Sequence, residues 1–243
     1  GAVGAALTLG LRSGGALTLR LSDYGCEGKV AAPSAATLRR SDEPNRIELD
    51  RAELTEWYVN GPLGIEQGFT VAEPGALIGH SVGEFVCAAL AGVMRLEDAL
   101  ALVLERGRRM QALPAGSMLS VRLSAADLTP RLPDDVVIAA ENAPGLCVAS
   151  GPADAVSRLE HELAASGVAA RRLVTSHAFH SAMMDPVVEP MAQMLATMEL
   201  HAPKIPILST VTAEWLEDSD ARSPDYWAAH LRRPVRFGPA VAR

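Results

Sequence analysis

A serine between two glycines, at the end of a short apolar stretch, is the feature that most constrains the fold. Ala76–Ile78 is followed by the motif Gly79-His80-Ser81-Val82-Gly83-Glu84. Beyond the serine, apolar residues recur at the spacing of one helical face, at Val82, Phe85, Val86, Ala89, Leu90 and Val93. We therefore expect a strand, a sharp turn at Ser81 and a helix.

This strand–turn–helix arrangement is typical of a nucleophilic serine. The turn lifts the hydroxyl out of the sheet, and backbone N–H groups at the start of the helix can stabilise an oxyanion. The sequence thus predicts Ser81 as a nucleophile and the N–H of Val82 as an oxyanion donor. The alternative is that Ser81 only caps a helix in a glycine-rich turn.

Two further segments carry groups that could assist such a serine. A helix expected at about Leu96–Gln111 ends with Arg106, Arg108 and Arg109, although solvation and the helix dipole alone explain these charges. The stretch 175–181 holds His177 and His180, either of which could act as a base. A lone histidine is more often structural.

Composition excludes several other classes. The chain has 243 residues, of which 49% are hydrophobic, so it can bury a sizeable core. Its net charge of −7 argues against nucleic-acid binding. The three cysteines are far apart and lack zinc spacing, and we expect no metal and a reducing, cytoplasmic compartment. No apolar run reaches membrane-spanning length, so we expect no membrane association.

Five ordered motifs resemble those of the acyltransferase domain of modular polyketide synthases, in the malonyl-CoA:acyl-carrier-protein transacylase family. The resemblance covers about residues 75–243. The motifs are Gly79-His80-Ser81-Val82-Gly83-Glu84, Glu105-Arg106-Gly107-Arg108-Arg109-Met110-Gln111, Glu141-Asn142-Ala143-Pro144-Gly145, His177-Ala178-Phe179-His180-Ser181, and Tyr226-Trp227 with Leu231-Arg232-Arg233-Pro234-Val235-Arg236-Phe237.

The resemblance implies a role for each site residue. Ser81 would be the nucleophile, His180 its base and Arg106 the clamp for the free carboxylate of the extender unit. His177 and Phe179 would set selectivity, in the form typical of malonyl-selective domains. His230 would orient the catalytic histidine, with a surface histidine as the alternative.

The resemblance also implies substrates and partners. Malonyl-CoA would be the substrate, no cofactor would be permanently bound, and the acyl acceptor would be phosphopantetheine on an acyl carrier protein. Other polyketide synthase domains would be further partners. The reaction would serve polyketide or fatty acid biosynthesis.

The expected fold is α/β, with an α/β-hydrolase-like core and an inserted ferredoxin-like subdomain. Strand and helix patterns after Ser117 follow the order βαββαβ, which is ferredoxin-like. We assign 117–174 to this small subdomain, and 73–116 with 175–243 to a large subdomain that is incomplete at both ends.

Residues 1–72 do not match the family. Their alternating leucines and turn residues predict a β-rich segment that opens with a hairpin. The family's Gly-Gln-Gly-x-Gln loop, which supplies an oxyanion donor, is not legible, and Gln67 has the wrong context. Without that donor we expect a rate lower by about 100- to 1,000-fold.

Two rival functions remain at this level. A serine thioesterase or hydrolase shares the elbow, but α/β-hydrolases order their triad serine, acid, histidine. The other rival is a catalytically impaired fragment or fusion of an acyltransferase, for which residues 1–72 are the relevant feature.

Overall fold

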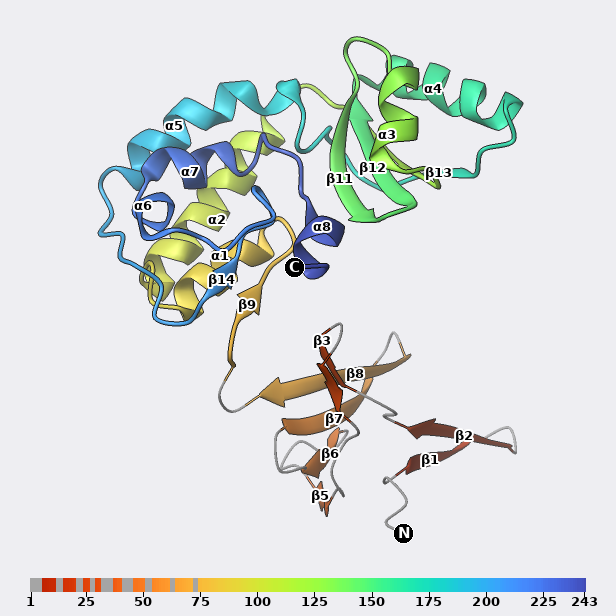
Figure 1. The fold of residues 1–243 in the computed structure, drawn as a ribbon, viewed down its shortest axis with the longest axis vertical. Coiled ribbons are helices and arrows are strands. Elements are labelled where there is room, and N and C mark those ends of the chain that lie inside the picture. Colours follow the sequence, from red (N-terminus) through yellow and green to blue (C-terminus); the bar gives the residue numbers. More distant parts are fainter. Residues whose placement is uncertain are drawn as a thin grey trace. The chain divides into compact units, whose positions relative to one another are not determined.

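The computed structural model describes residues 6–11, 15–20, 24–26, 29–31, 37–40, 46–50, 54–61, 64–71 and 74–243. The chain divides into two compact units, Gly1–Pro74 and Gly75–Arg243 (Figure 1). The serine motif and every candidate site residue lie in the second unit.

The described part of the first unit consists of antiparallel strands. The predicted hairpin is present, since β1 (Ala6–Leu11) pairs with β2 (Gly15–Arg20). Gln67 lies in the last strand and pairs with Tyr58. The other strands form one short pair and a four-stranded meander in sequence order: β3 (Tyr24–Cys26), β4 (Lys29–Ala31), β5 (Thr37–Arg40), β6 (Arg46–Asp50), β7 (Leu54–Gly61) and β8 (Gly64–Val71).

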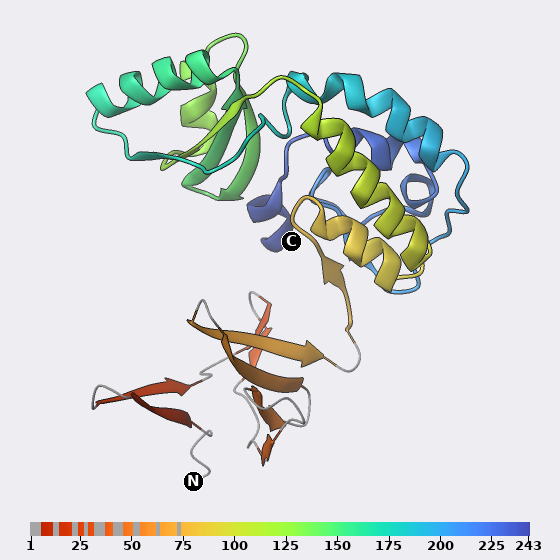
Figure 2. The ribbon, with the colours of Figure 1, turned by 180° about the vertical axis from the view of Figure 1, so that it is seen from behind.

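The second unit begins with a parallel strand pair carrying the elbow. Strand β9 (Leu77–Ile78) pairs with β14 (Ile207–Leu208), and α1 (Gly83–Leu90) follows β9 after the turn. The helices around this pair are α2 (Leu96–Gln111), α5 (Asp185–Leu195), α6 (Asp218–Ala221) and α7 (Pro224–Ala229) (Figure 2). Helix α2 contacts both α1 and α5.

These helices enclose the main core. Amphipathic spacing places one face of α2 and α5 inward, and the side chain of Trp227 at the centre is 1% exposed. The 3-10 turn η2 (Ala182–Met184) leads into α5, which tolerates Pro190 in its interior. Large, fully buried members of this core are Leu102, Met184, Met191, Leu195, Ile207 and Leu231.

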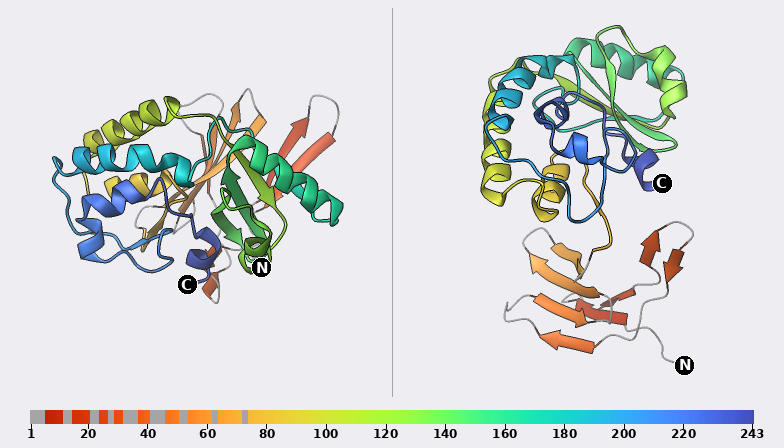
Figure 3. Two further views of the ribbon diagram at one scale, coloured as in Figure 1. Left: turned by 90° about the horizontal axis from the view of Figure 1, so that it is seen from above. Right: turned by 60° about the vertical axis from the view of Figure 1, so that its left-hand side comes forward.

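The small part of the second unit has the predicted βαββαβ order. Its strands lie in the order β11-β12-β10-β13, all antiparallel, and α3 and α4 share one core on one face (Figure 3). The elements are β10 (Ser117–Val121), α3 (Ala125–Leu128), η1 (Thr129–Arg131), β11 (Val137–Ala143), β12 (Leu146–Gly151), α4 (Ala153–Ala165) and β13 (Ala170–Arg172).

The chain after α7 joins the large and small parts of this unit. Val235 forms a parallel bridge with Ala140, and Glu141 N–H donates to the carbonyl of Val235 at 2.8 Å. Helix α8 (Phe237–Val241) then packs against β11. This segment therefore covers the free edge of β11 while it runs past the elbow.

Among the described residues, no helix is both long and apolar enough to cross a membrane. Within the same residues, no group of three histidine, cysteine or acidic side chains is placed to hold a metal ion.

Candidate active site

The elbow turns as tightly as its sequence suggests. Ser81 has a φ of 52°, in the left-handed region that non-glycine residues rarely occupy. A Cβ on Gly79 would lie 2.3 Å from the carbonyl carbon of Gly83, so only glycine fits there. A Cβ on Gly83 would meet nothing within 4 Å. The first glycine is thus required by close backbone approach, and the second is not.

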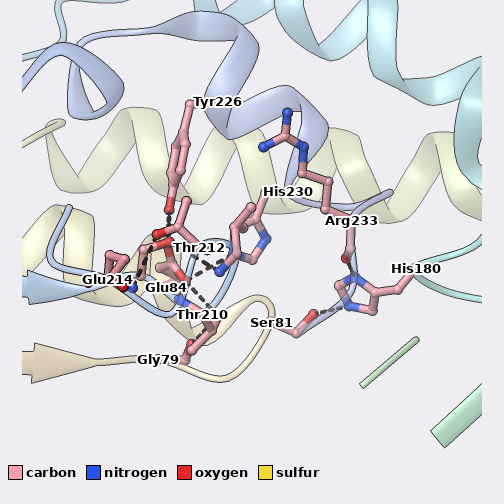
Figure 4. Close-up of polar contacts among 12 residues, drawn as sticks. Gly79, Ser81, Glu84, His180, Thr210, Thr212, Glu214, Tyr226, His230 and Arg233 are labelled. Carbon is pink, nitrogen blue, oxygen red and sulfur yellow. Dashed lines mark hydrogen bonds and ion pairs between the residues drawn. The ribbon is translucent and has the colours of Figure 1, made fainter. Parts of the chain in front are cut away.

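Ser81 and His180 meet across 99 positions of sequence. Ser81 Oγ lies 2.7 Å from His180 Nε2, and His180 Nδ1 lies 2.8 Å from the carbonyl oxygen of Arg233 (Figure 4). A carbonyl can only accept, so Nδ1 carries the proton and Nε2 is free to accept from the serine. The geometry is that of a nucleophile with its general base.

Burial keeps this imidazole neutral. His180 is 4% exposed. Burial is the main cause and lowers its pKa to about 4; the hydrogen bond to the Arg233 carbonyl opposes this effect, and the positive charge of Arg106 adds to the lowering. At neutral pH His180 is therefore ready to take a proton.

Arg106 brings an unpaired cation to the same place. Its Nη2 lies 3.4 Å from Ser81 Oγ, its Nε has no hydrogen-bond partner, and its side chain forms no ion pair within the part of the chain that the structure describes. The residue is 6% exposed, and burial lowers its pKa to about 10, so it stays charged at neutral pH. A buried guanidinium with unused donors is suited to an anionic ligand.

The guanidinium is supported by an aromatic ring. Its central carbon lies 6.0 Å from the ring centroid of Phe85, which itself packs against Trp227 and His230. Phe85 thus connects the cation to the core of the large part.

The N–H of Val82 is available at the start of α1. The first turn uses Gly83 N–H to His80 O at 3.0 Å and Glu84 N–H to Ser81 O at 2.9 Å. The N–H of Val82 has no hydrogen bond to another described residue, and it directly follows the serine. This position suits an oxyanion donor.

His177 and Phe179 lie close to each other beside the base. Their ring centroids are 6.2 Å apart. His177 is anchored at both nitrogens, by Leu113 O at 3.1 Å and Ser176 Oγ at 2.8 Å. Phe179 packs against the large core and against the cluster around β11. Hydrogen bonds thus position the ring of His177, and packing positions the ring of Phe179.

The expectation for His230 is corrected by the structure. Arg233, through its backbone carbonyl, is the group that holds Nδ1 of His180. His230 is 1% exposed, and its Nε2 lies 3.2 Å from Oε2 of Glu84 without the angles of a hydrogen bond. A backbone carbonyl leaves no mark in the sequence, which is why Arg233 could not be identified from side-chain chemistry.

Glu84 is a second residue that sequence reasoning did not assign. Its carboxylate is fully buried, and it accepts from Thr210 and Tyr226 (Figure 4). Burial raises the pKa of this carboxylate, but His230, Tyr226 and Thr210 together outweigh burial, so the net pKa lies below its usual value. Its place in the serine motif was the only signal.

A family model described as "Acyl transferase domain" matches residues 66–243. A phenolphthiocerol synthesis polyketide synthase of Mycobacterium marinum is 45% identical over 171 residues, which are 70% of this chain and 8% of that protein. The mycoketide-CoA synthase of Mycobacterium tuberculosis is 42% identical over 205 residues, covering 84% and 5% of the two chains.

Two solved structures have the same fold. The acyl transferase domain of SpnD, in complex with 2-(pent-4-yn-1-yl)malonyl, is 41% identical with a TM-score of 0.67, covering 70% of this chain and 41% of that one. The malonyl CoA-acyl carrier protein transacylase from Burkholderia pseudomallei is 33% identical with a TM-score of 0.64, covering 69% and 59%. The chain thus spans a small fraction of the curated relatives.

Proposed function

The chain belongs to the acyl transferase domain family, and we propose that it transfers a malonyl-type extender unit from coenzyme A to an acyl carrier protein through an acyl-Ser81 intermediate. One observation carries the proposal. The Ser81 hydroxyl lies 2.7 Å from a neutral imidazole and 3.4 Å from a buried guanidinium that forms no ion pair with any residue the structure describes. The first contact supplies a nucleophile, and the second favours a substrate with a carboxylate.

The first half-reaction follows from the hydrogen bonds. Ser81 Oγ attacks the thioester carbonyl as its proton moves to His180 Nε2, and the Arg233 carbonyl holds the imidazolium through Nδ1–H. The N–H of Val82 stabilises the oxyanion. The C–S bond then breaks, the coenzyme A sulfur takes the proton from His180, and malonyl remains esterified to Ser81.

The second half-reaction reverses the roles with a different thiol. The phosphopantetheine thiol of the carrier gives its proton to His180 and attacks the acyl-Ser81 ester. The C–O bond to Ser81 then breaks, and Ser81 Oγ takes the proton back from His180. If the acyl group is transferred in this way, an acyl carrier protein is a partner of this chain. The other domains of a polyketide synthase would then be further partners.

Arg106 would bind the free carboxylate of the malonyl group. Its Nε has no hydrogen-bond partner among the described residues, and a planar guanidinium binds carboxylates through two parallel hydrogen bonds. His177 and Phe179 would limit the space at C2 of the extender, which favours malonyl over branched units. Both rings are anchored, which suits such a role.

At the level of the fold, we propose that residues 73–116 and 175–243 form the α/β-hydrolase-like core and 117–174 the ferredoxin-like subdomain. The strand order β11-β12-β10-β13 with two helices on one face supports the second assignment.

A labelling experiment tests the function. The protein is mixed with malonyl-CoA and its intact mass is measured, with Ser81→Ala and Ser120→Ala as matched variants. We expect a malonyl adduct on the wild type and on the Ser120 variant, because Ser120 lies in β10. We expect none on Ser81→Ala, and an adduct there would remove Ser81 from its role.

A second measurement separates the hydrolase alternative. The acylated protein is divided between buffer alone and buffer with a carrier-protein thiol, and loss of the adduct is followed by mass. Faster loss to the thiol, with malonyl recovered on the carrier, supports transfer. Equal loss in both samples supports a hydrolase.

A further inference from the structure

A fully buried carboxylate lies close to the catalytic pair without touching it. Glu84 is 0% exposed and is the third residue after Ser81, at the start of α1. Its Oε2 accepts from the backbone N–H of Thr210 at 2.9 Å and from its hydroxyl at 2.7 Å. A buried charge is retained only where several donors compensate it.

Thr210 connects this carboxylate to the segment behind the base. Its carbonyl accepts from the N–H of Arg236 at 2.6 Å. Arg236 also donates through Nη1 to the carbonyl of Thr212 at 2.8 Å. The loop after β14 is thus bound to the elbow helix on one side and to the segment 231–236 on the other.

The segment 231–236 in turn holds His180. The carbonyl of Arg233 accepts from Nδ1 at 2.8 Å, and the carbonyl of Leu231 accepts from the backbone N–H of His180 at 3.3 Å. The backbone of His180 is in the left-handed region, with a φ of 58°, so its position depends on such external contacts.

These contacts close a ring that starts and ends at the catalytic pair. It runs from Ser81 through the start of α1 to Glu84, through Thr210 to Arg236, back along the chain to Arg233, and through His180 to Ser81 Oγ. Figure 4 shows the links from Glu84 to Thr210, from Arg233 to His180 and from His180 to Ser81. We propose that Glu84 is a positioning residue that sets the Oγ–Nε2 distance of this pair through Thr210. The proposal rests on the proposed acyl transfer at Ser81.

The competing explanation is that Glu84 only stabilises the fold. Tyr226 helps to separate the two, because its hydroxyl donates to the other oxygen of the same carboxylate and has no hydrogen bond to Thr210 itself, although it also pairs with Ser209 Oγ at 2.6 Å. Removing that hydroxyl takes one buried hydrogen bond from Glu84 and one from Ser209, but it removes neither of the two hydrogen bonds between Thr210 and Glu84. A stabilising role predicts similar effects of Glu84→Gln and Tyr226→Phe, whereas a positioning role predicts different ones.

The test uses the full chain and a fluorophosphonate, which reacts with a serine activated by a histidine and has no carboxylate. Serine Oγ attacks phosphorus, fluoride leaves, and the proton passes to His180. The rate of labelling at Ser81 is measured by mass at several pH values, for the wild type, Glu84→Gln and Tyr226→Phe. Circular dichroism and thermal unfolding are followed in parallel.

We expect Glu84→Gln to lower the labelling rate by about 10- to 100-fold, as a shift of about 1 Å between reacting groups does. Its rate should rise with pH, because hydroxide replaces the displaced base. Tyr226→Phe should lower the unfolding temperature and keep the wild-type labelling rate and pH profile.

Two outcomes would overturn the proposal. One is a folded Glu84→Gln protein with the wild-type rate and pH profile, and the other is an equal loss of rate in Tyr226→Phe. If Glu84→Gln does not fold, Thr210→Val is measured in its place. This substitution removes the hydroxyl that donates to Glu84 and keeps the backbone N–H that also donates to it. A wild-type labelling rate in Thr210→Val contradicts the proposal that Glu84 acts through Thr210. Failure of the wild-type protein to react at Ser81 would instead contradict the proposed function.

Discussion

At the scale of the residue, the charge of Arg106 is the feature with the most direct consequence for substrate choice. We expect Arg106→Ala to lower the ratio of kcat/KM for malonyl-CoA to that for acetyl-CoA by about 10- to 100-fold, since a hydrogen bond to a charged group contributes about 1.5–3 kcal/mol. Acylation rates with the two thioesters measure this ratio.

Arg108→Ala is the matched control for that experiment. Arg108 lies on the same helix but is exposed and pairs with Glu105 at 2.7 Å. Its removal should leave the ratio unchanged. An unchanged ratio in Arg106→Ala as well would reduce Arg106 to a charge at the end of a helix.

The pH dependence of acylation should reflect the buried imidazole. The pKa of His180 lies at about 4, below its usual 6.5, chiefly because of burial. A protonated imidazole cannot accept the serine proton, so the acylation rate should fall as the pH drops through about 4 and stay level near neutrality. Single-turnover acylation of Ser81 measured across this range checks the expectation. A midpoint between about 6 and 7 would mean that His180 titrates as a solvated histidine.

The sequence identifies those residues of this site that belong to a recognisable sequence motif and act through their side chains. Ser81 stands between glycines before a helix, and the resemblance supplied His180 and Arg106, which the structure brings to Ser81. Arg233 acts through its backbone, so its residue type carries no information. The partners of Glu84, Thr210 and Tyr226, lie 126 and 142 positions away, and only the assembled fold defines these contacts.

At the scale of the element, the elbow depends on one glycine more than on the other. Gly79→Ala would push a Cβ into the backbone of Gly83 at 2.3 Å. We expect a destabilisation of about 1–3 kcal/mol or more, together with loss of Ser81 acylation, because the turn must open. Thermal unfolding and the malonyl adduct are the two measurements.

Gly83→Ala is the matched control, since its Cβ meets nothing within 4 Å and Gly83 is the first residue of α1. Alanine is the better helix former by about 1 kcal/mol, so the unfolding temperature should stay the same or rise. Equal destabilisation by both substitutions would contradict the close approach at Gly79.

Helix boundaries followed from the sequence more closely than strand ends. The helix Leu96–Gln111 has the predicted limits, and Ser124 caps α3 by accepting from Asp127 N–H at 3.2 Å, because charges and caps are local signals. The sequence predicts a strand over 168–174, and the structure limits this strand to Ala170–Arg172, the part that pairs with β10. Strand limits depend on a partner strand, which local sequence does not define.

At the scale of the whole molecule, the second unit carries a row of exposed apolar side chains on α1 and α2. Leu90, Leu100 and Leu104 are 65%, 56% and 73% exposed, and Val86 and Leu96 are similarly open. A groove of about 240 Å³ lies among these helices, lined mostly by alanine, valine and leucine. The helical spacing of apolar residues predicts that one face of α1 is buried. Only part of that face is buried in the structure, since Phe85 is buried and Val86 is exposed.

A contiguous apolar surface of this kind binds hydrophobic dyes. We expect the full chain to increase the fluorescence of anilinonaphthalene sulfonate, and the double substitution Leu90→Gln with Leu100→Gln to remove most of that increase. Each exposed change should alter the free energy of unfolding by less than about 0.5 kcal/mol. Leu102→Ala is the contrasting variant, since Leu102 is 0% exposed and its truncation should cost about 2–5 kcal/mol. Absence of dye binding by the wild-type chain, or undiminished binding by the double variant, would mean that this face is covered in solution.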